Sequence, residues 1–146
     1  MALVQKGVAM AAKCLPKVIT PRVHSAIDYA VAGSFLLAGA IFWKRNRRAA
    51  VGSILCGGTT AAVSLLTDYS GRGRKPISYS MHGQIDTGLV AMTAAIPRLA
   101  NIENAPEARF FAGQAIAKTA ITAMTSFENG AHGLEPDEDE DEHLGI

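Results

Sequence analysis

Four long apolar segments dominate the pattern of hydrophobic and polar positions along the chain, at about 21–43, 48–67, 79–98 and 107–126. Each has the length of about 20 residues that a helix needs to cross a hydrocarbon core of about 30 Å. Gly, Ala, Ser and Thr are frequent within them, and small residues let membrane helices pack closely. Apolar and polar residues do not alternate between turn signals, so strands are not expected. The pattern predicts an all-α protein with four transmembrane helices.

A soluble four-helix bundle is the alternative to four membrane spans. The fourth segment contains Arg109, Gln114 and Lys118, which make it polar for a helix that faces lipid. In contrast, the stretches 29–42 and 49–66 have no charged residue, whereas a water-facing helix needs a polar stripe. The membrane interpretation is therefore favoured, and the fourth helix is expected to be the one most buried against protein.

The chain aligns with itself when it is shifted by 58 positions without a gap. The matched positions include His24 and His82, Ile27 and Ile85, Asp28 and Asp86, Thr67 and Thr125, and Tyr69 and Phe127. This internal repeat indicates two tandem two-helix units, at 20–69 and 78–127, within a four-helix membrane domain at 20–127. Because each unit would cross the membrane twice, the two units are expected to be parallel, related by an axis along the membrane normal.

The two ends of the chain differ from this domain in charge. Lys6, Lys13 and Lys17 fall near one helical face, so residues 1–19 are predicted to form an amphipathic segment in the membrane interface. The acidic tail, at 128–146, is predicted to be disordered, and seven of the 13 acidic residues lie at 135–142 within it. The rest of the chain is basic, which suits an anionic lipid bilayer, and no nucleic-acid motif is present.

The motif His-x-x-Ile-Asp begins the first and third apolar segments. His24 and Asp28 are four residues apart and share a helical face, as do His82 and Asp86. A carboxylate within a membrane helix normally faces the bundle interior and has a partner there. Because the two units are expected to be parallel, both His-Asp pairs should lie on the same side of the membrane at similar depth, where they could converge.

Residues at equal height in each hairpin can be read from the sequence if the hairpin folds symmetrically about its loop. On this register His24 lies level with Thr67, and His82 lies level with Thr125. Each histidine is therefore expected to bind the aspartate of its own helix and the threonine of its own hairpin.

The same register gives the two aspartates different partners. Lys118 falls within one helical turn of Asp86, so an ion pair between them is expected. The first unit has Thr60 in place of Lys118, so Asp28 must use His24, a threonine or water.

Three interpretations of these polar residues are open. The residues are His24, Asp28, Thr67, His82, Asp86, Lys118 and Thr125. They could form a structural clasp at the end of the bundle. His24, Asp28, His82 and Asp86 could instead bind a metal ion, or the two histidines could hold a haem, since helical bundles commonly house cofactors. Paired carboxylates could also serve a proton or ion pathway. No nucleophile-base-orienter triad is present, so no enzymatic activity is expected.

The chain resembles small bacterial membrane proteins of the SPW-repeat type. The resemblance covers about 20–127 and is carried by two tandem two-helix units, each opened by His-x-x-(Ile/Leu)-Asp, with LLTDY at 65–69 closing the first. The Ser-Pro-Trp of that family is missing, because the chain reads IFWKRN after the first helix and IPRLAN after the third. The resemblance implies a four-helix, multi-pass protein of a bacterial inner membrane, and it implies no reaction.

These observations together predict a small, non-enzymatic integral membrane protein. Its expected role is that of an accessory or scaffold subunit that acts through contacts within a membrane-protein complex. The alternative is a bundle that binds a metal or haem, or that handles ions or protons, through the paired His-Asp motifs.

Overall fold

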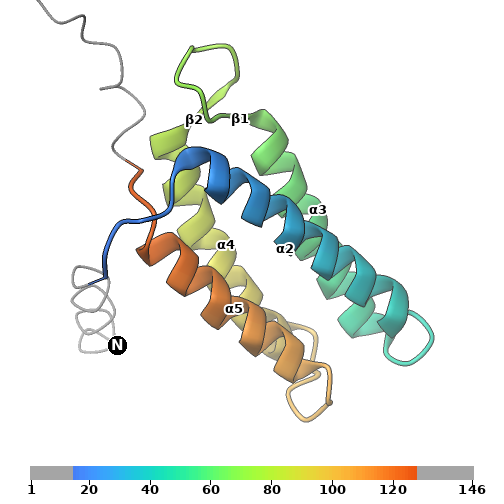
Figure 1. Ribbon diagram of the computed structural model, residues 1–146. Coiled ribbons are helices and arrows are strands. Elements are labelled where there is room, and N and C mark those ends of the chain that lie inside the picture. The colour runs from blue at the N-terminus through green and yellow to red at the C-terminus, as the bar shows by residue number, and fades with distance from the viewer. Residues whose placement is uncertain (1–14, 128–146) are drawn as a thin grey trace, which may run out of the picture.

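The computed structural model describes residues 15–127, which are mostly helical (Figure 1). The helices are α2 (Pro21–Phe42), α3 (Arg47–Leu66), α4 (Tyr79–Leu99) and α5 (Ala108–Ala123). Helices α2 and α3 form a first antiparallel hairpin, and α4 and α5 form a second hairpin beside it. The all-α class is thus confirmed. Most of the predicted amphipathic segment and the whole acidic tail lie outside the described residues.

Side-chain caps fix where α2 and α4 begin. The Thr20 hydroxyl accepts a hydrogen bond from the backbone N–H of Val23 at 3.4 Å, and Pro21 takes the first helical position. Ser78 accepts in the same way from the N–H of Met81 at 3.2 Å. A hydroxyl at this position satisfies one of the free N–H groups at a helix start, so both long helices begin a few residues before their histidine.

Glycines bring the backbones of α2 and α3 close together. A Cβ on Gly57 would lie 2.9 Å from the backbone oxygen of Ala32, and one on Gly39 would lie 2.7 Å from Cγ1 of Ile54. Residues this small let two helices approach to backbone contact. The contacts agree with the register predicted for the first hairpin.

Two short parallel pairings tie the hairpins together at the end where α2 and α4 begin and α3 and α5 finish, which we call the tied end (Figure 1). Strand β1 (Thr67–Asp68) pairs with strand β2 (Ile77–Ser78), and Ile19 forms an isolated bridge with Thr125. The sequence interpretation, which expected no strands, was wrong here because two residues are too few to show alternation. Helix α5 also ends earlier than predicted, at Ala123, because Thr125 leaves the helix to pair with Ile19.

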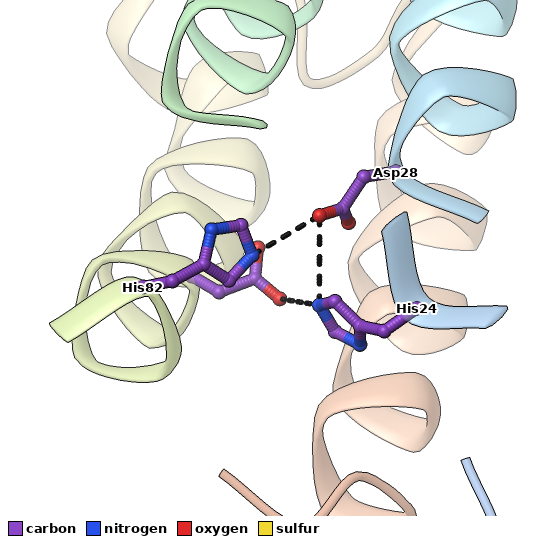
Figure 2. A group of neighbouring side chains, drawn as sticks. His24, Asp28 and His82 are labelled. Atoms are coloured by element: carbon purple, nitrogen blue, oxygen red, sulfur yellow. Dashed lines mark ion pairs between the residues drawn. The ribbon is translucent and has the colours of Figure 1, made fainter. Parts of the chain in front are cut away.

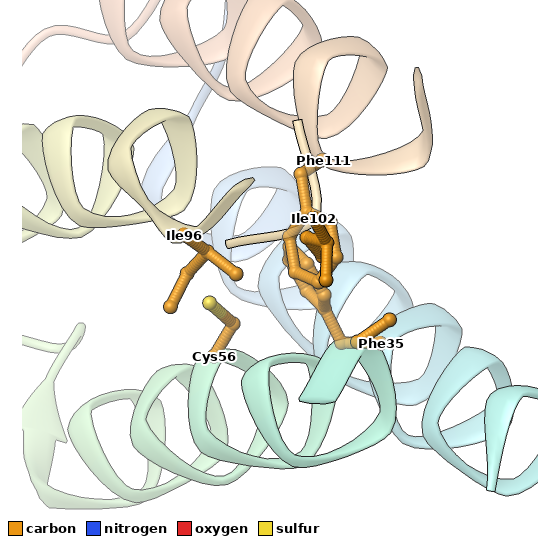
Figure 3. Close-up of a cluster of buried hydrophobic side chains, with 6 residues drawn as sticks. Phe35, Cys56, Ile96, Ile102 and Phe111 are labelled. Carbon is orange, nitrogen blue, oxygen red and sulfur yellow. The ribbon is translucent and has the colours of Figure 1, made fainter. Parts of the chain in front are cut away.

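An apolar cluster fills the bundle on the side of the loops between helices, away from the tied end (Figure 3). Its buried members are Phe35, Ala49, Cys56, Ile96, Ile102 and Phe111. The ring of Phe110 packs edge-on against that of Phe35, with their centroids 5.3 Å apart. All four helices meet at this cluster, so it holds the two hairpins side by side.

Helices α2 and α3 carry apolar side chains on their outer surfaces. Both are long and apolar enough to cross a membrane, with mean hydropathies of 1.6 and 1.7 in their most apolar windows. Only 28% of the window in α2 and 44% of that in α3 is buried within the protein. Leu37 is 63% exposed and Leu55 is 56% exposed. The two helices therefore have the composition of core helices but face outward.

Candidate metal centre

His24, Asp28, His82 and Asp86 converge between the first turns of α2 and α4. Figure 2 shows His24, Asp28 and His82 pointing toward one another from the two helices. One ligand atom from each of the four residues lies within 4.8 Å of all the others, and none of the four is more than 3% exposed. The prediction that the two His-Asp pairs converge is confirmed.

Each histidine binds the threonine of the other hairpin. Nδ1 of His24 lies 2.9 Å from the Thr125 hydroxyl, and Nδ1 of His82 lies 2.8 Å from the Thr67 hydroxyl. The expected pairing within each hairpin, His24 with Thr67 and His82 with Thr125, was therefore wrong. The predicted heights were right, because both threonines lie level with both histidines at the tied end.

The parallel pairings explain this exchange. Thr67 pairs with Ile77, five residues before His82 on the same chain segment, and Thr125 pairs with Ile19, five residues before His24. Each threonine is thus held beside the start of the helix that carries its histidine. The two pairings are related by the 58-residue repeat, because Thr125 corresponds to Thr67, Ile19 to Ile77 and His24 to His82.

The threonines also determine which nitrogen of each imidazole carries a proton. The hydroxyl of Thr67 donates to the backbone carbonyl of Val63 at 2.7 Å, and that of Thr125 donates to the carbonyl of Ile121 at 2.7 Å. A hydroxyl has one proton to donate, so each threonine must accept the Nδ1–H of its histidine. In the neutral imidazole, Nε2 then presents its lone pair.

Both Nε2 atoms face carboxylates at ion-pair distance. Nε2 of His82 lies 3.0 Å from Oδ2 of Asp28, and Nε2 of His24 lies 3.5 Å from the same oxygen and 3.8 Å from Oδ2 of Asp86. Both nitrogens are buried, and the two aspartates are the polar groups nearest to them among the described residues. A buried polar atom without a partner is costly, so each Nε2 needs either a proton that it donates to the facing carboxylate or a metal ion between the two.

Asp28 is held by neutral donors that the sequence interpretation missed. Its Oδ2 accepts hydrogen bonds from the Ser64 hydroxyl at 3.1 Å and from the Tyr69 hydroxyl at 3.0 Å. Burial raises the pKa of Tyr69, so this phenol stays protonated and donates at neutral pH. The predicted hairpin register could have identified Ser64, because it places that residue level with Asp28.

Asp86 is held by a cation. Nζ of Lys118 lies 2.9 Å from Oδ1 of Asp86, which confirms the predicted ion pair. The hydroxyl of Thr122 donates to Oδ2 of the same carboxylate at 2.9 Å. Thr122 lies 58 residues after Ser64. Each aspartate therefore accepts a hydrogen bond from a hydroxyl at the equivalent position of its hairpin, and only Asp86 also contacts a lysine.

Aromatic rings cover the centre at the tied end. The rings of Tyr79 and Phe127 pack against His24, with centroid distances of 6.1 and 5.3 Å, and Tyr69 packs against His82 at 5.4 Å. This cover keeps bulk water from the four ligand atoms, as their low exposure shows.

The predicted alternative of a haem between the two histidines does not fit this arrangement. The imidazole rings meet edge to face with their centroids 5.3 Å apart. Oδ2 of Asp28 lies within 3.5 Å of Nε2 of both histidines, in the space that the macrocycle would occupy. A single ion fits between these atoms, whereas a porphyrin would displace the carboxylates.

The comparisons with known proteins give no relative from which a function could be transferred. No protein-family model matches the chain, and no curated protein or solved structure shows significant similarity to it. The resemblance to SPW-repeat proteins rests on the quoted residues and stays a prediction.

Proposed function

We propose that this protein is a multi-pass membrane protein that binds one transition-metal ion at His24, Asp28, His82 and Asp86. The observation that carries the proposal is the convergence of two buried imidazoles and two buried carboxylates, whose ligand atoms all lie within 4.8 Å of one another. A cation at this point would satisfy both lone pairs and both carboxylates at once. The threonines supply the outer contact at Nδ1 that orients histidine ligands in metal sites.

The donor set favours a particular class of metal. Imidazole nitrogen together with carboxylate oxygen suits first-row divalent ions such as Zn²⁺, and a calcium site would supply six to eight oxygens instead. Tetrahedral coordination at bond lengths of 2.0–2.2 Å places ligand atoms about 3.3–3.6 Å apart. Three of the separations between Nε2 and Oδ2 atoms are 3.0, 3.5 and 3.8 Å. All four ligand atoms lie within 4.8 Å of one another, so an ion would have to draw the most distant of them closer.

Membrane embedding is supported by the outer surfaces of the helices. The exposed leucines, isoleucines and valines of α2 and α3 would be in lipid rather than in water. Among the described residues, only α2 and α3 are both long and apolar enough to cross a membrane by themselves. Helix α4 has 21 residues and would span about 31 Å. Helix α5 has 16 residues and would span about 24 Å, so it would cross only where the bilayer thins around it. The charged residues of α4 and α5 at membrane depth, Asp86 and Lys118, point into the bundle, as intramembrane charges do. We therefore propose that all four helices cross the bilayer.

The far end of the bundle favours binding over transport. The apolar cluster around Phe35 and Phe111 closes the interior between the centre and the interhelical loops. Aromatic rings cover the centre at the tied end as well, so this arrangement does not favour the predicted alternative of an ion pathway. The accessory or scaffold role and the lack of enzymatic activity stay predictions.

Metal analysis of the full-length protein, purified in detergent and reloaded with Zn²⁺ after chelation, tests the proposal. We expect one equivalent of zinc per chain. His24→Ala and His82→Ala should each lower zinc affinity by at least the 10- to 100-fold that outer-shell changes cause. Gln84→Ala, on the exposed face of α4, is the matched control and should retain full binding. Equal zinc binding by the wild type and both histidine variants would contradict the proposal.

Alkaline carbonate extraction of native membranes tests the location separately. The protein should remain in the membrane pellet with its metal. Recovery of the chain as a soluble monomer without detergent would exclude membrane embedding and would leave the metal site to be judged on its own.

A further inference from the structure

The two oxygens of Asp86 have different partners. Oδ1 contacts Nζ of Lys118 at 2.9 Å, whereas Oδ2 is turned to the centre, 3.8 Å from Nε2 of His24. Both side chains of the ion pair are buried, with relative exposures of 3%. Lys118 has no other ionic partner among residues 15–127, so Oδ1 of Asp86 is the oxygen that its ammonium compensates.

This ion pair restricts how Asp86 can bind a metal. A carboxylate can bind a cation through one oxygen or through both. When an ammonium is 2.9 Å from Oδ1, a metal at that oxygen would bring two cations together in a buried site, where the repulsion between like charges is large. Asp86 is therefore held to binding through Oδ2 alone.

The first hairpin has no equivalent cation, and Asp28 presents one oxygen, Oδ2, to both histidines. The residue 58 positions before Lys118 is Thr60, which is also buried but carries no charge. The oxygen of Asp28 that faces the two histidines is Oδ2, and the hydroxyls of Ser64 and Tyr69 hold that oxygen. The lysine is thus a feature of one carboxylate in an otherwise matched pair of ligand residues.

We propose that Lys118 determines the metal specificity of the centre by keeping Asp86 monodentate. This inference rests on the proposed metal-binding function. Two imidazole nitrogens and one oxygen from each aspartate make four donors, which suits tetrahedral Zn²⁺ or Co²⁺. Without the lysine, Asp86 can bind through both oxygens, and the coordination number rises to five. Ions that prefer more oxygen ligands, such as Mn²⁺, then compete better.

Cobalt substitution in the full-length protein in detergent reads the coordination number directly, because tetrahedral Co²⁺ absorbs visible light much more strongly than five- or six-coordinate Co²⁺. We expect an intense visible spectrum from the wild type and a weaker one from Lys118→Met. The preference for Zn²⁺ over Mn²⁺ in a competition titration should fall by about tenfold in the variant, at the lower end of outer-shell effects on metal affinity. Thr60→Val is the matched control in the first hairpin and should leave both measurements unchanged.

Lys118→Thr gives a second test that keeps a polar group, since it places at 118 the residue type that the first hairpin has at 60. If circular dichroism shows that Lys118→Met does not fold, Lys118→Thr takes its place. This variant should show the same loss of spectral intensity and of Zn²⁺ preference. A Co²⁺ spectrum and a metal preference that match the wild type in the folded variants would overturn the role of Lys118 but leave the metal site standing. A wild-type protein that binds no Co²⁺ would overturn both.

Discussion

The two hairpins bring one carboxylate each to the same place and stabilise it by different means. In the first, Asp28 is held by the neutral hydroxyls of Ser64 and Tyr69. In the second, Asp86 is held by the Lys118 ammonium and one hydroxyl. Hydroxyls donate without adding charge, whereas the ammonium also neutralises its partner. If both histidines are neutral, the cluster of two aspartates and one lysine has a net charge of −1, which would favour a bound cation.

The hairpins also differ in how their helices pack. Helices α2 and α3 approach to backbone contact at Gly39 and Gly57 and expose apolar side chains outside. Helix α5 instead directs Lys118 inward. The difference indicates a division of roles: the first hairpin has the more apolar, tightly packed scaffold, and the second supplies the charge that distinguishes the two aspartates. Four experiments test this comparison.

The largest effect is expected from removing the cation of the second hairpin. Lys118→Met in metal-free protein leaves Asp86 buried without its partner, and the free energy of unfolding should fall by roughly 3 kcal/mol. Adding Asp86→Asn should recover part of that loss, because no uncompensated charge remains. Unfolding in detergent measures both values. Strictly additive losses would show that the two side chains do not interact.

A smaller effect is expected where the first hairpin packs through glycine. Gly57→Ala would bring Cβ within 2.9 Å of the Ala32 carbonyl oxygen and should lower the free energy of unfolding by about 2 kcal/mol, within the usual range for overpacking. Gly58→Ala, the next residue on the same helix, meets nothing within 4 Å and should be nearly neutral. Equal effects of the two substitutions would contradict the close approach of α2 and α3.

The exchange of partners between hairpins should give a coupling of about 1 kcal/mol, the typical value of one hydrogen bond. In a double-mutant cycle on metal-free protein, His24→Ala should couple with Thr125→Val and not with Thr67→Val. The reverse result would restore the pairing within each hairpin that the sequence suggested.

The smallest effect concerns the loop that connects the hairpins. Hydrogen bonds from the Ser70 hydroxyl at 2.6 Å and from the backbone N–H of Arg74 at 3.0 Å lower the pKa of Asp68. A lowered pKa gives stability that is present above the unfolded pKa, near 4, and is lost as the pH falls below it. Asp68→Asn should therefore lower the melting temperature slightly at pH 7, with the difference from wild type shrinking toward pH 3. A constant difference would show that the carboxylate does not bind the loop.

The sequence predicted the helices and the height of the polar residues well. The length and apolarity of the segments gave four helices, and the hairpin register placed Lys118 beside Asp86, as the ion pair confirms. It could not identify which threonine each histidine binds, because Thr67 and Thr125 both lie at the height of both imidazoles. That choice depends on two-residue pairings at the tied end, which are too short to leave a periodic pattern.

The residues that form the centre could be predicted from the sequence, but their chemical role could not. His-x-x-Ile-Asp placed each pair on one helical face, but it favoured a structural clasp and left a metal site and an ion pathway as alternatives. The proposed metal site rests in part on where the imidazole protons lie, which is inferred from the bonds of Thr67 and Thr125 to carbonyls one turn earlier. Threonine at such a position is common in helices for other reasons, so no sequence signal marks its role here.

X-ray absorption spectroscopy of the zinc-loaded, full-length protein tests the central claim most directly, because it reports the atoms bound to the metal. The account predicts four nitrogen and oxygen ligands at about 2.0–2.2 Å, with the scattering pattern of two imidazoles, one of which is lost in His24→Ala. A zinc ion with sulfur ligands, with six oxygen ligands, or with the same imidazole signal in the variant would contradict it.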